Sequence, residues 1–187
     1  MGERKIIIIR GKVTAGKTTT SHELAKVLPG WILIDPWKIK EMFEPLGLKD
    51  RSVLKNTSKK AMVLIMREVI RNLGINIIVQ ETTQKFVRKH LRQDLKKYNY
   101  KLYSFFLDID LENAIKRDIK REKPTMGIGK SIKTRAEWEK AKAQPDKGDF
   151  VIHTGKHKIK EVVDMILSEI KEKRRKNPNA NFIRKCY

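Results

Sequence analysis

The chain has 187 residues, of which 43 are Lys or Arg and 22 are Asp or Glu, so its formal net charge is +21. This length is typical of one domain, whose core would bury roughly 70% of the unfolded surface without help from disulfides or a structural metal. The single cysteine, Cys186, excludes an intramolecular disulfide and cysteine-based metal sites, and it favours a reducing, cytoplasmic compartment. The longest apolar run, Ile6–Ile9, is too short to cross a membrane, so we expect no membrane partner.

The excess of positive charge has two explanations. A lysine-rich proteome would give a basic, solvated surface, but thermophilic enrichment raises Lys and Glu together. Here basic residues outnumber acidic ones almost two to one. A partner rich in phosphate is therefore the favoured explanation.

Five short apolar segments predict strands, and segments with helical periodicity separate them. The predicted strands are Lys5–Arg10, Trp31–Ile34, Ile75–Val79, Leu102–Leu107 and Phe150–His153. The predicted helices are Lys17–Leu28, Lys55–Leu73, Gln84–Tyr98, Leu111–Glu122 and Lys158–Arg175. Because strands without strict alternation suit a sheet covered on both faces, this order predicts an α/β fold, a five-stranded parallel sheet sandwiched by helices.

The expected domain covers residues 1–175, with a lid at about 123–134 and a basic, flexible tail at 176–187. Two helices show a predicted buried face. One consists of Val87, Leu91 and Leu95, and the other of Ala61, Leu64, Ile65, Val69 and Leu73.

The segment Gly11–Thr18 fits the pattern G-x-x-x-x-G-K-[ST], directly after a strand and at the start of a helix. Backbone N–H groups of such a loop and the helix N-terminus bind the phosphates of ATP. Lys17 is expected to neutralise phosphate oxygens, and the Thr18 hydroxyl to complete the coordination of Mg²⁺. The predicted nucleotide-binding residues here are Gly11, Val13, Thr14, Ala15, Gly16, Lys17, Thr18 and Thr19.

This loop predicts the cofactor but not the reaction. A GTPase would carry an Asn/Thr-Lys-x-Asp element for guanine, which the chain lacks. The small size favours a phosphotransferase.

Asp35 directly follows the second predicted strand, where the carboxyl ends of parallel strands face the ligand. It is a candidate for orienting an acceptor hydroxyl and taking its proton, although an Asp before Pro36 is also a good helix N-cap. Lys38, one helical turn later, either holds a phosphate of the acceptor or is a solvated lysine. Trp37 is expected to pack against the sheet rather than to stack on a base.

Glu81 ends the third predicted strand and is a candidate for a water-mediated contact with Mg²⁺ or for binding the acceptor, together with Thr82. Thr82 or Thr83 would cap the next helix. Arg117 and Arg121 lie one helical turn apart before the lid. Arg121 is expected to contact the transferring phosphoryl group, and Arg117 to lie on the adenine.

These motifs resemble those of P-loop kinases of small substrates and, among them, the 5′-polynucleotide kinases. The likeness extends over residues 5–175 and includes the phosphate loop, Asp35 and the segment Ala-Ile-Lys-Arg-Asp-Ile-Lys-Arg at 114–121. The resemblance implies that Asp35 is the general base, that Lys38 holds a 3′-phosphate of the substrate and that Arg121 contacts the transferred phosphate. Polynucleotide kinases have Arg where this chain has Lys38. The segment Gly-Asp-Phe-Val-Ile-His-Thr-Gly resembles the adenine-side loop of the wider family, which implies a role for Thr154 beside the nucleotide.

The distribution of charge favours a polymeric acceptor. Residues 84–142 contain 17 basic and 8 acidic residues, and one helix face carries Lys85, Arg88, Lys89, Arg92 and Lys96. We therefore expect an ATP- and Mg²⁺-dependent kinase of the 5′-OH of RNA or DNA. Two alternatives are a kinase of a small metabolite, nucleoside or antibiotic, and a nucleotide-gated nucleic-acid-binding protein without transfer chemistry.

Overall fold

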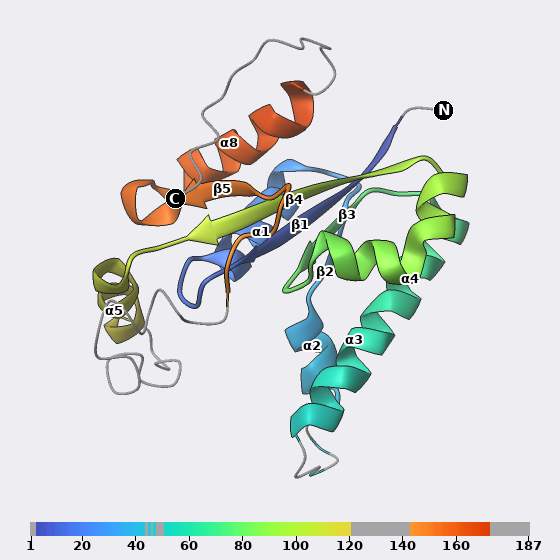
Figure 1. Cartoon of the computed structure of the whole chain (residues 1–187), viewed down its shortest axis with the longest axis horizontal. Helices are drawn as coiled ribbons and strands as arrows, with labels where there is room; N and C mark the ends of the chain where they lie inside the picture. The colour runs from blue at the N-terminus through green and yellow to red at the C-terminus, as the bar shows by residue number, and fades with distance from the viewer. Residues whose placement is uncertain (1–2, 44, 46, 48–50, 121–142, 173–187) are drawn as a thin grey trace.

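The computed structural model describes residues 3–43, 45, 47, 51–120 and 143–172. Its centre is one parallel sheet with the strand order β2-β3-β1-β4-β5 (Figure 1). The strands are β1 Arg4–Gly11, β2 Ile32–Ile34, β3 Ile77–Gln80, β4 Tyr100–Asp108 and β5 Phe150–His153. The helices are α1 Lys17–Val27, α2 Pro36–Glu41, α3 Arg51–Glu68, α4 Gln84–Lys97, α5 Leu111–Ile119 and α8 Ile159–Glu172. The predicted fold class is confirmed.

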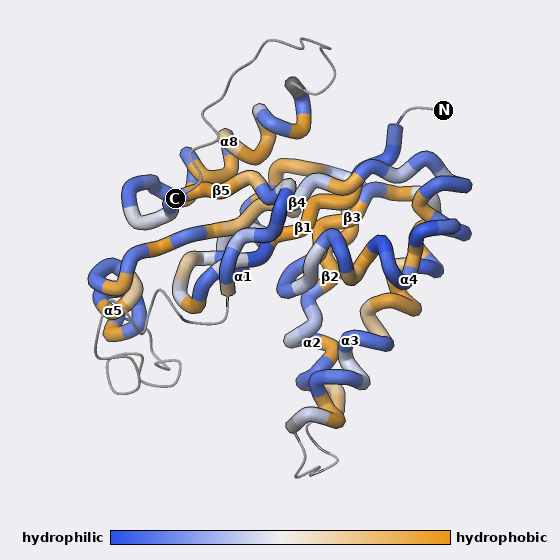
Figure 2. Tube along the Cα trace, in the orientation of Figure 1, coloured by the Kyte–Doolittle hydropathy of each residue, from blue (hydrophilic) through white to orange (hydrophobic). Residues whose placement is uncertain are grey.

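Both faces of the sheet are covered, as the continuous apolar strands require (Figure 2). On one face, α1 and α8 pack against β1 and β4, with Leu24 and Ile166 fully buried. On the other face, α2, α3 and α4 pack over Ile6 and Ile8 of β1 and over β3. The central strand β1 pairs with β3 on one side and β4 on the other, so its four isoleucines are completely buried.

The buried face predicted for α4 is confirmed, because Val87, Leu91 and Leu95 are all buried. The cap of this helix is Thr83, whose hydroxyl oxygen accepts a hydrogen bond from the N–H of Phe86 at 3.1 Å. The alternative cap, Thr82, is instead buried.

The buried face predicted for the preceding helix was largely wrong. Leu64 and Leu73 are 61% and 60% exposed, whereas Met62, Met66 and Ile70 are buried. The segment predicted as one helix, Lys55–Leu73, consists of α3, which begins earlier than expected at Arg51, and a π-helical turn at Val69–Leu73. The π-turn changes the helical period only at Val69–Leu73, which includes Leu73, whereas Leu64 and Ile65 precede it and lie on the exposed side of α3.

Other boundaries differ by a few residues, as helix and strand ends commonly do. β2 begins at Ile32, β3 runs from Ile77 to Gln80, and α8 ends at Glu172. The predicted lid at 123–134 and the tail at 176–187 lie outside the described residues. No helix among the described residues is both long and apolar enough to span a membrane.

Candidate nucleotide-binding site

The loop between β1 and α1 begins at a glycine that the sheet itself requires. Gly11 has a φ of 145°, and a Cβ atom placed on it would lie 2.1 Å from the carbonyl oxygen of Leu107 on the neighbouring strand. That same oxygen accepts a hydrogen bond from the N–H of Lys12 at 3.1 Å. The close approach of β1 to β4 therefore fixes where the loop leaves the sheet.

Gly16 forms the N-cap of α1 with a left-handed backbone, φ 90° and ψ 20°. It has no side chain to cap the helix, and the first turn contains no acidic residue. The first N–H groups of an 11-residue helix thus remain free of a side-chain cap, and the partial positive charge of the helix end adds to them. This arrangement suits a phosphate group.

Lys17, at the start of α1, is held by three oxygen atoms. Its Nζ lies 2.8 Å from the carbonyl oxygen of Lys12, 3.2 Å from that of Gly11 and 3.1 Å from Oε1 of Glu81. Glu81 follows β3 with a φ of 53°, and its N–H donates to the carbonyl oxygen of Ile9 on β1. Glu81, a candidate for the metal or the acceptor, is therefore in direct contact with Lys17, the lysine expected to neutralise phosphate oxygens.

Thr18 lies opposite Gln80, the last residue of β3. The Oγ1 atom of Thr18 and the Oε1 atom of Gln80 are 3.4 Å apart, and the Gln80 side chain is buried. Among the described residues, its Nε2 atom has no hydrogen-bond partner. The Thr18 hydroxyl and the Gln80 amide each offer a neutral oxygen, and the Glu81 carboxylate is next in sequence. These ligands fit Mg²⁺ if phosphate and water complete its coordination shell. The described residues contain no cluster of three His, Cys, Asp or Glu side chains for a metal.

A pocket of about 250 Å³ adjoins this loop. Its lining comes from the phosphate loop, α1, α5 and the segment after β5, and consists of Thr14, Ala15, Gly16, Thr19, Thr20, Arg117, Thr154, His157, Ile159 and Val162. Arg117 donates from Nη2 to the carbonyl oxygen of Thr154 at 2.6 Å and from Nη1 to its hydroxyl at 3.3 Å. The predicted nucleotide-binding residues of the phosphate loop, Arg117 and Thr154 thus line one cavity, although they come from separate parts of the chain.

The same region contains an ion-pair cluster that sequence reasoning missed. Asp108 ends β4, with Oδ1 2.9 Å from Nζ of Lys12 and Oδ2 3.0 Å from Nδ1 of His153. Its carbonyl oxygen accepts a hydrogen bond from the hydroxyl of Thr154. Asp108 therefore joins the phosphate loop to the segment that lines the pocket. The rule that selected Asp35 and Glu81, an acid at the carboxyl end of a parallel strand, would also have selected Asp108.

On the acceptor side, Asp35 is the N-cap of α2. Its Oδ1 accepts a hydrogen bond from the N–H of Trp37 at 2.9 Å, and no contact of the other carboxylate oxygen is found within the described part of the chain. Lys38 is 72% exposed and lies 3.5 Å from the carboxylate of Glu41. The expected packing of Trp37 was wrong, because this side chain is 53% exposed and its only described ring contact is Nζ of Lys40, 4.8 Å from the ring centroid.

Of the remaining predicted residues, Val13 is exposed at the tip of the loop. Arg121, the candidate for the transferring phosphoryl group, lies outside the described residues. The structure thus gathers the nucleotide-side residues around one loop, and it places Asp35 at the end of β2 on the far side of β3.

The helix that carries Arg117 has a cap with a testable pH dependence. The carboxylate of Asp110 accepts hydrogen bonds from the backbone and side-chain N–H groups of Asn113, and these lower the pKa of Asp110. A lowered pKa stabilises the fold above the unfolded value, and this contribution is lost as the pH falls through the folded value. We expect Asp110→Ala to cost about 1 kcal/mol at pH 7 and clearly less at pH 3, measured by urea unfolding in matched salt. Neither Asn nor Ala titrates at this position, so the difference in stability between Asp110→Asn and Asp110→Ala should be the same at pH 7 and pH 3; equal costs of Asp110→Ala relative to wild type at both pH values would contradict this role.

Solved structures with the same fold include several kinases. The tunicamycin resistance protein of Deinococcus radiodurans is 20% identical, with 90% of this chain and 96% of that chain covered and a TM-score of 0.63. The APS kinase of Mycobacterium tuberculosis, solved with AMPPNP and APS, is 14% identical over 91% and 99% of the two chains, with a TM-score of 0.61. Thymidylate kinase of Candida albicans is 16% identical over 92% and 93%, with a TM-score of 0.59. At these identities the likeness establishes that the chain shares the fold of these proteins.

No curated protein sequence matches the chain. A family model described as "Zeta toxin" matches residues 2–176, which is nearly the whole chain. The matched range includes the phosphate loop, Asp35, Glu81 and the residues that line the pocket beside this loop. The chain therefore belongs to the Zeta toxin family.

Proposed function

We propose that the protein is an ATP-dependent phosphotransferase that transfers the γ-phosphate to a hydroxyl group, with the 5′-OH of a polynucleotide as the acceptor. The observation that carries this proposal is the arrangement around Gly16, where an uncapped helix N-terminus and Lys17 adjoin the pocket lined by Arg117 and Thr154. The triphosphate would lie on the loop and the adenine in the pocket. A P-loop kinase solved with AMPPNP has the same fold, which supports ATP as the donor.

Each residue then has a definite task in the transfer. The bond between the γ-phosphorus and the β–γ bridging oxygen breaks, and a bond from the acceptor oxygen to the γ-phosphorus forms. Asp35 aligns the acceptor hydroxyl and takes its proton, while Lys17 neutralises charge on the phosphate oxygens. Arg121 contributes a further positive charge from the segment after α5.

Thr18 and Gln80 are the residues that would hold Mg²⁺, with Glu81 positioned to bind one of its water molecules. A cation held there would neutralise negative charge that develops on the phosphate oxygens. Gln80 is buried beside Thr18, so its amide oxygen keeps one position from which it orients the threonine hydroxyl.

The contact between Lys17 and Glu81 makes a prediction about nucleotide binding. Because the carboxylate competes with phosphate for Lys17, Glu81→Gln should tighten binding of ATP without Mg²⁺ by about fivefold, the effect of a partly exposed pair worth about 1 kcal/mol. If Glu81 also binds a water of the cation, the Mg²⁺ concentration for half-maximal activity should rise by roughly tenfold. Calorimetric titration of ATP without Mg²⁺ measures the first effect, and transfer assays over a range of Mg²⁺ concentrations measure the second; unchanged values in both would remove Glu81 from the site.

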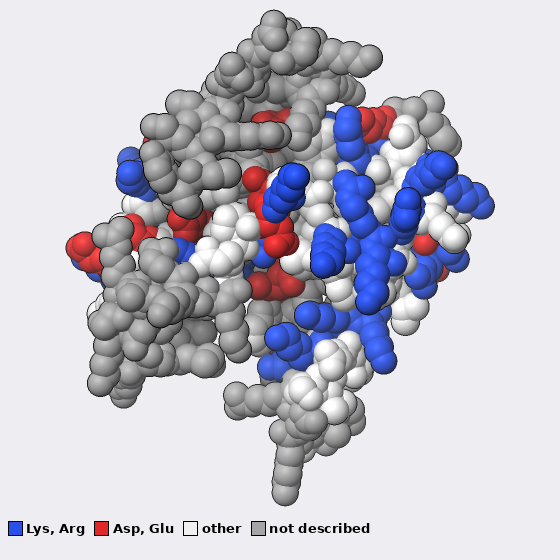
Figure 3. Space-filling view, in the orientation of Figure 1, with Lys and Arg blue, Asp and Glu red and all other residues white. Residues whose placement is uncertain are grey.

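The choice of a polynucleotide depends on charge. The chain carries a net charge of +21, far more than ATP and one cation require, and basic side chains gather over α4 (Figure 3). A neutral acceptor such as a sugar gains nothing from such a surface, whereas a strand of phosphodiesters does.

A second candidate is a kinase of a small molecule. It is favoured by the similar folds, whose names refer to tunicamycin resistance and to APS rather than to nucleic acid. Side-by-side label transfer from γ-labelled ATP separates the two. We expect labelled 5′-OH RNA or DNA oligonucleotides, with weaker labelling of mononucleoside 3′-phosphates. Labelled sugars, nucleotide sugars or APS with unlabelled oligonucleotides would establish the second candidate instead.

A further inference from the structure

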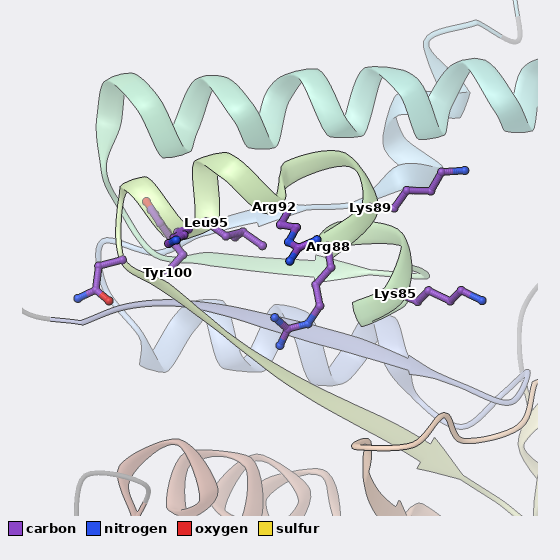
Figure 4. A pocket seen from close by; sticks show the side chains of 8 residues that line it. Lys85, Arg88, Lys89, Arg92, Leu95 and Tyr100 are labelled. Atoms are coloured by element: carbon purple, nitrogen blue, oxygen red, sulfur yellow. The ribbon is translucent and has the colours of Figure 1, made fainter.

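A groove of about 780 Å³ lies along α4 and the start of β4, separate from the nucleotide pocket. Its lining is rich in cations and contains no acid: Lys85, Arg88, Lys89, Arg92, Leu95, Lys96, Asn99 and Tyr100. Figure 4 shows Lys85 and Lys89 at one end, Arg88 and Arg92 in the middle, and Leu95 and Tyr100 at the other end. We propose that this groove binds the sugar-phosphate backbone of a single nucleic-acid strand, on the 3′ side of the acceptor hydroxyl; this proposal rests on the proposed function.

The positive charge of the groove is not neutralised by neighbouring side chains. All five basic residues are exposed, and in the described ranges of the chain no carboxylate pairs with any of them. Among the described residues, their one side-chain hydrogen bond runs from Nη2 of Arg88 to Oε1 of Gln84, at 3.5 Å. Five cations on one helix face repel one another, and an anionic ligand would relieve that repulsion.

The single acidic residue of α4 points away from the groove. Asp94 is buried on the side of α4 that contacts α3 and the π-helical turn. Its two carboxylate oxygens lie 2.7 Å from Nε of Arg71 and 3.4 Å from Nε of Arg67. The hydrogen bond that Arg71 donates to the carboxylate of Asp94 raises the pKa of Arg71. The acid of α4 thus pairs with α3 and the π-helical turn, and the lining of the groove contains no acid.

The position of the groove suits a strand whose end is in the active site. α4 begins three residues after Glu81, which contacts Lys17, so Lys85 lies at the end of the groove nearer to the phosphate loop. From Lys85 to Lys96 the helix rises by about 16 Å. A strand carries one phosphate per 3.4 Å in a duplex and fewer when extended, so the groove spans roughly three to five phosphates.

The shape and lining favour a strand over an anionic membrane. Surfaces that bind bilayers insert exposed apolar side chains between the headgroups. The apolar members of this lining, Leu95 and Tyr100, are only 6% and 8% exposed and lie at the end of the groove away from Lys85 (Figure 4). A surface hollow lined by exposed cations fits a flexible polyanion.

The test compares two double variants with the same change of charge. Arg88→Gln with Arg92→Gln alters the groove, and Lys160→Gln with Lys171→Gln alters exposed positions on α8, which covers the other face of the sheet. The probe is a 12-nucleotide single strand of RNA or DNA with a free 5′-OH and a 3′ fluorophore, titrated by anisotropy from 50 to 300 mM KCl. We expect the groove variant to bind at least tenfold more weakly at low salt. The slope of log affinity against log salt should become less steep by about 1.4, the value for two lost phosphate contacts. The α8 variant should stay within twofold of wild type.

Separate measurements distinguish the failure of this proposal from that of the proposed function. The groove variant should keep the wild-type Kd for ATP and wild-type transfer to a mononucleoside 3′-phosphate, which is too short to reach the groove. Unchanged strand binding, or an equal loss in the α8 variant, would overturn the groove site. Binding to phosphatidylglycerol vesicles but not to the strand would also overturn it. Salt-dependent strand binding that the groove variant loses, without any labelled product from wild type, would support the groove site and refute the transfer.

Discussion

Replacing Asp35 by Asn is expected to lower turnover by about 10²–10⁴, because the variant cannot take the proton of the acceptor hydroxyl. Affinity for ATP should stay within twofold of wild type, since Asp35 lies at the end of β2, away from the phosphate loop. Single-turnover label transfer and a separate ATP titration measure the two quantities.

The structure makes this substitution informative because Asp35 is also a helix cap. Asn accepts a hydrogen bond from the N–H of Trp37 as well as Asp does, so the start of α2 should be preserved. Asp110→Asn, the same change at the N-cap of α5, is the matched control and should keep full turnover. If Asp35→Asn kept full turnover, Asp35 would be a cap only and the general base would be another residue.

Replacing Gly11 by Ala is expected to destabilise the protein by at least about 3 kcal/mol. The added Cβ would lie 2.1 Å from the carbonyl oxygen and 2.7 Å from the nitrogen of Leu107, which are backbone atoms of a central strand and cannot move aside. The strained φ of 145° adds a further cost. Urea unfolding, followed by circular dichroism, measures the loss, and nucleotide binding should fall with it.

Gly30→Ala separates the two causes. Gly30 also has a positive φ, 79°, but a Cβ there meets nothing within 4 Å. This variant should lose only about 1–2 kcal/mol. Equal losses in the two variants would show that backbone conformation alone, rather than the approach of β1 to β4, requires glycine in the loop.

The sequence predicted the fold and the position of the loop between β1 and α1, for a physical reason. A parallel sheet buried on both faces requires continuous apolar strands, and Ile6–Ile9 has this form without ambiguity. The loop between β1 and α1 requires positive φ angles at Gly11 and Gly16, and the motif G-x-x-x-x-G-K-[ST] contains both glycines.

The residues that were missed depend on contacts between distant segments. Gln80 gains its importance only from facing Thr18, and no local pattern marks a glutamine at the end of an apolar strand. Lys12 was treated as a variable position of the loop, although it pairs with Asp108 across the sheet. Such pairs depend on strand order, which apolar patterns alone do not specify.

The errors at α3 and Trp37 have a different origin. Hydrophobicity marks Leu64 as a core residue, yet the neighbouring methionines fill the core and Leu64 faces outward. On α2 it is Ile39 that faces the core, so Trp37 remains exposed beside Asp35.

The most direct test of the account is the identity of the product. Wild-type protein would be incubated with γ-labelled ATP, Mg²⁺ and a 5′-OH 12-mer, and the product digested to mononucleotides. We predict that the label is recovered in a 5′-phosphate of the terminal nucleotide and that Asp35→Asn lowers its yield at least a hundredfold under single-turnover conditions. If the label remained in ATP or appeared only as inorganic phosphate, while wild type and Asp35→Asn bound the 12-mer equally well, transfer to a polynucleotide would be contradicted.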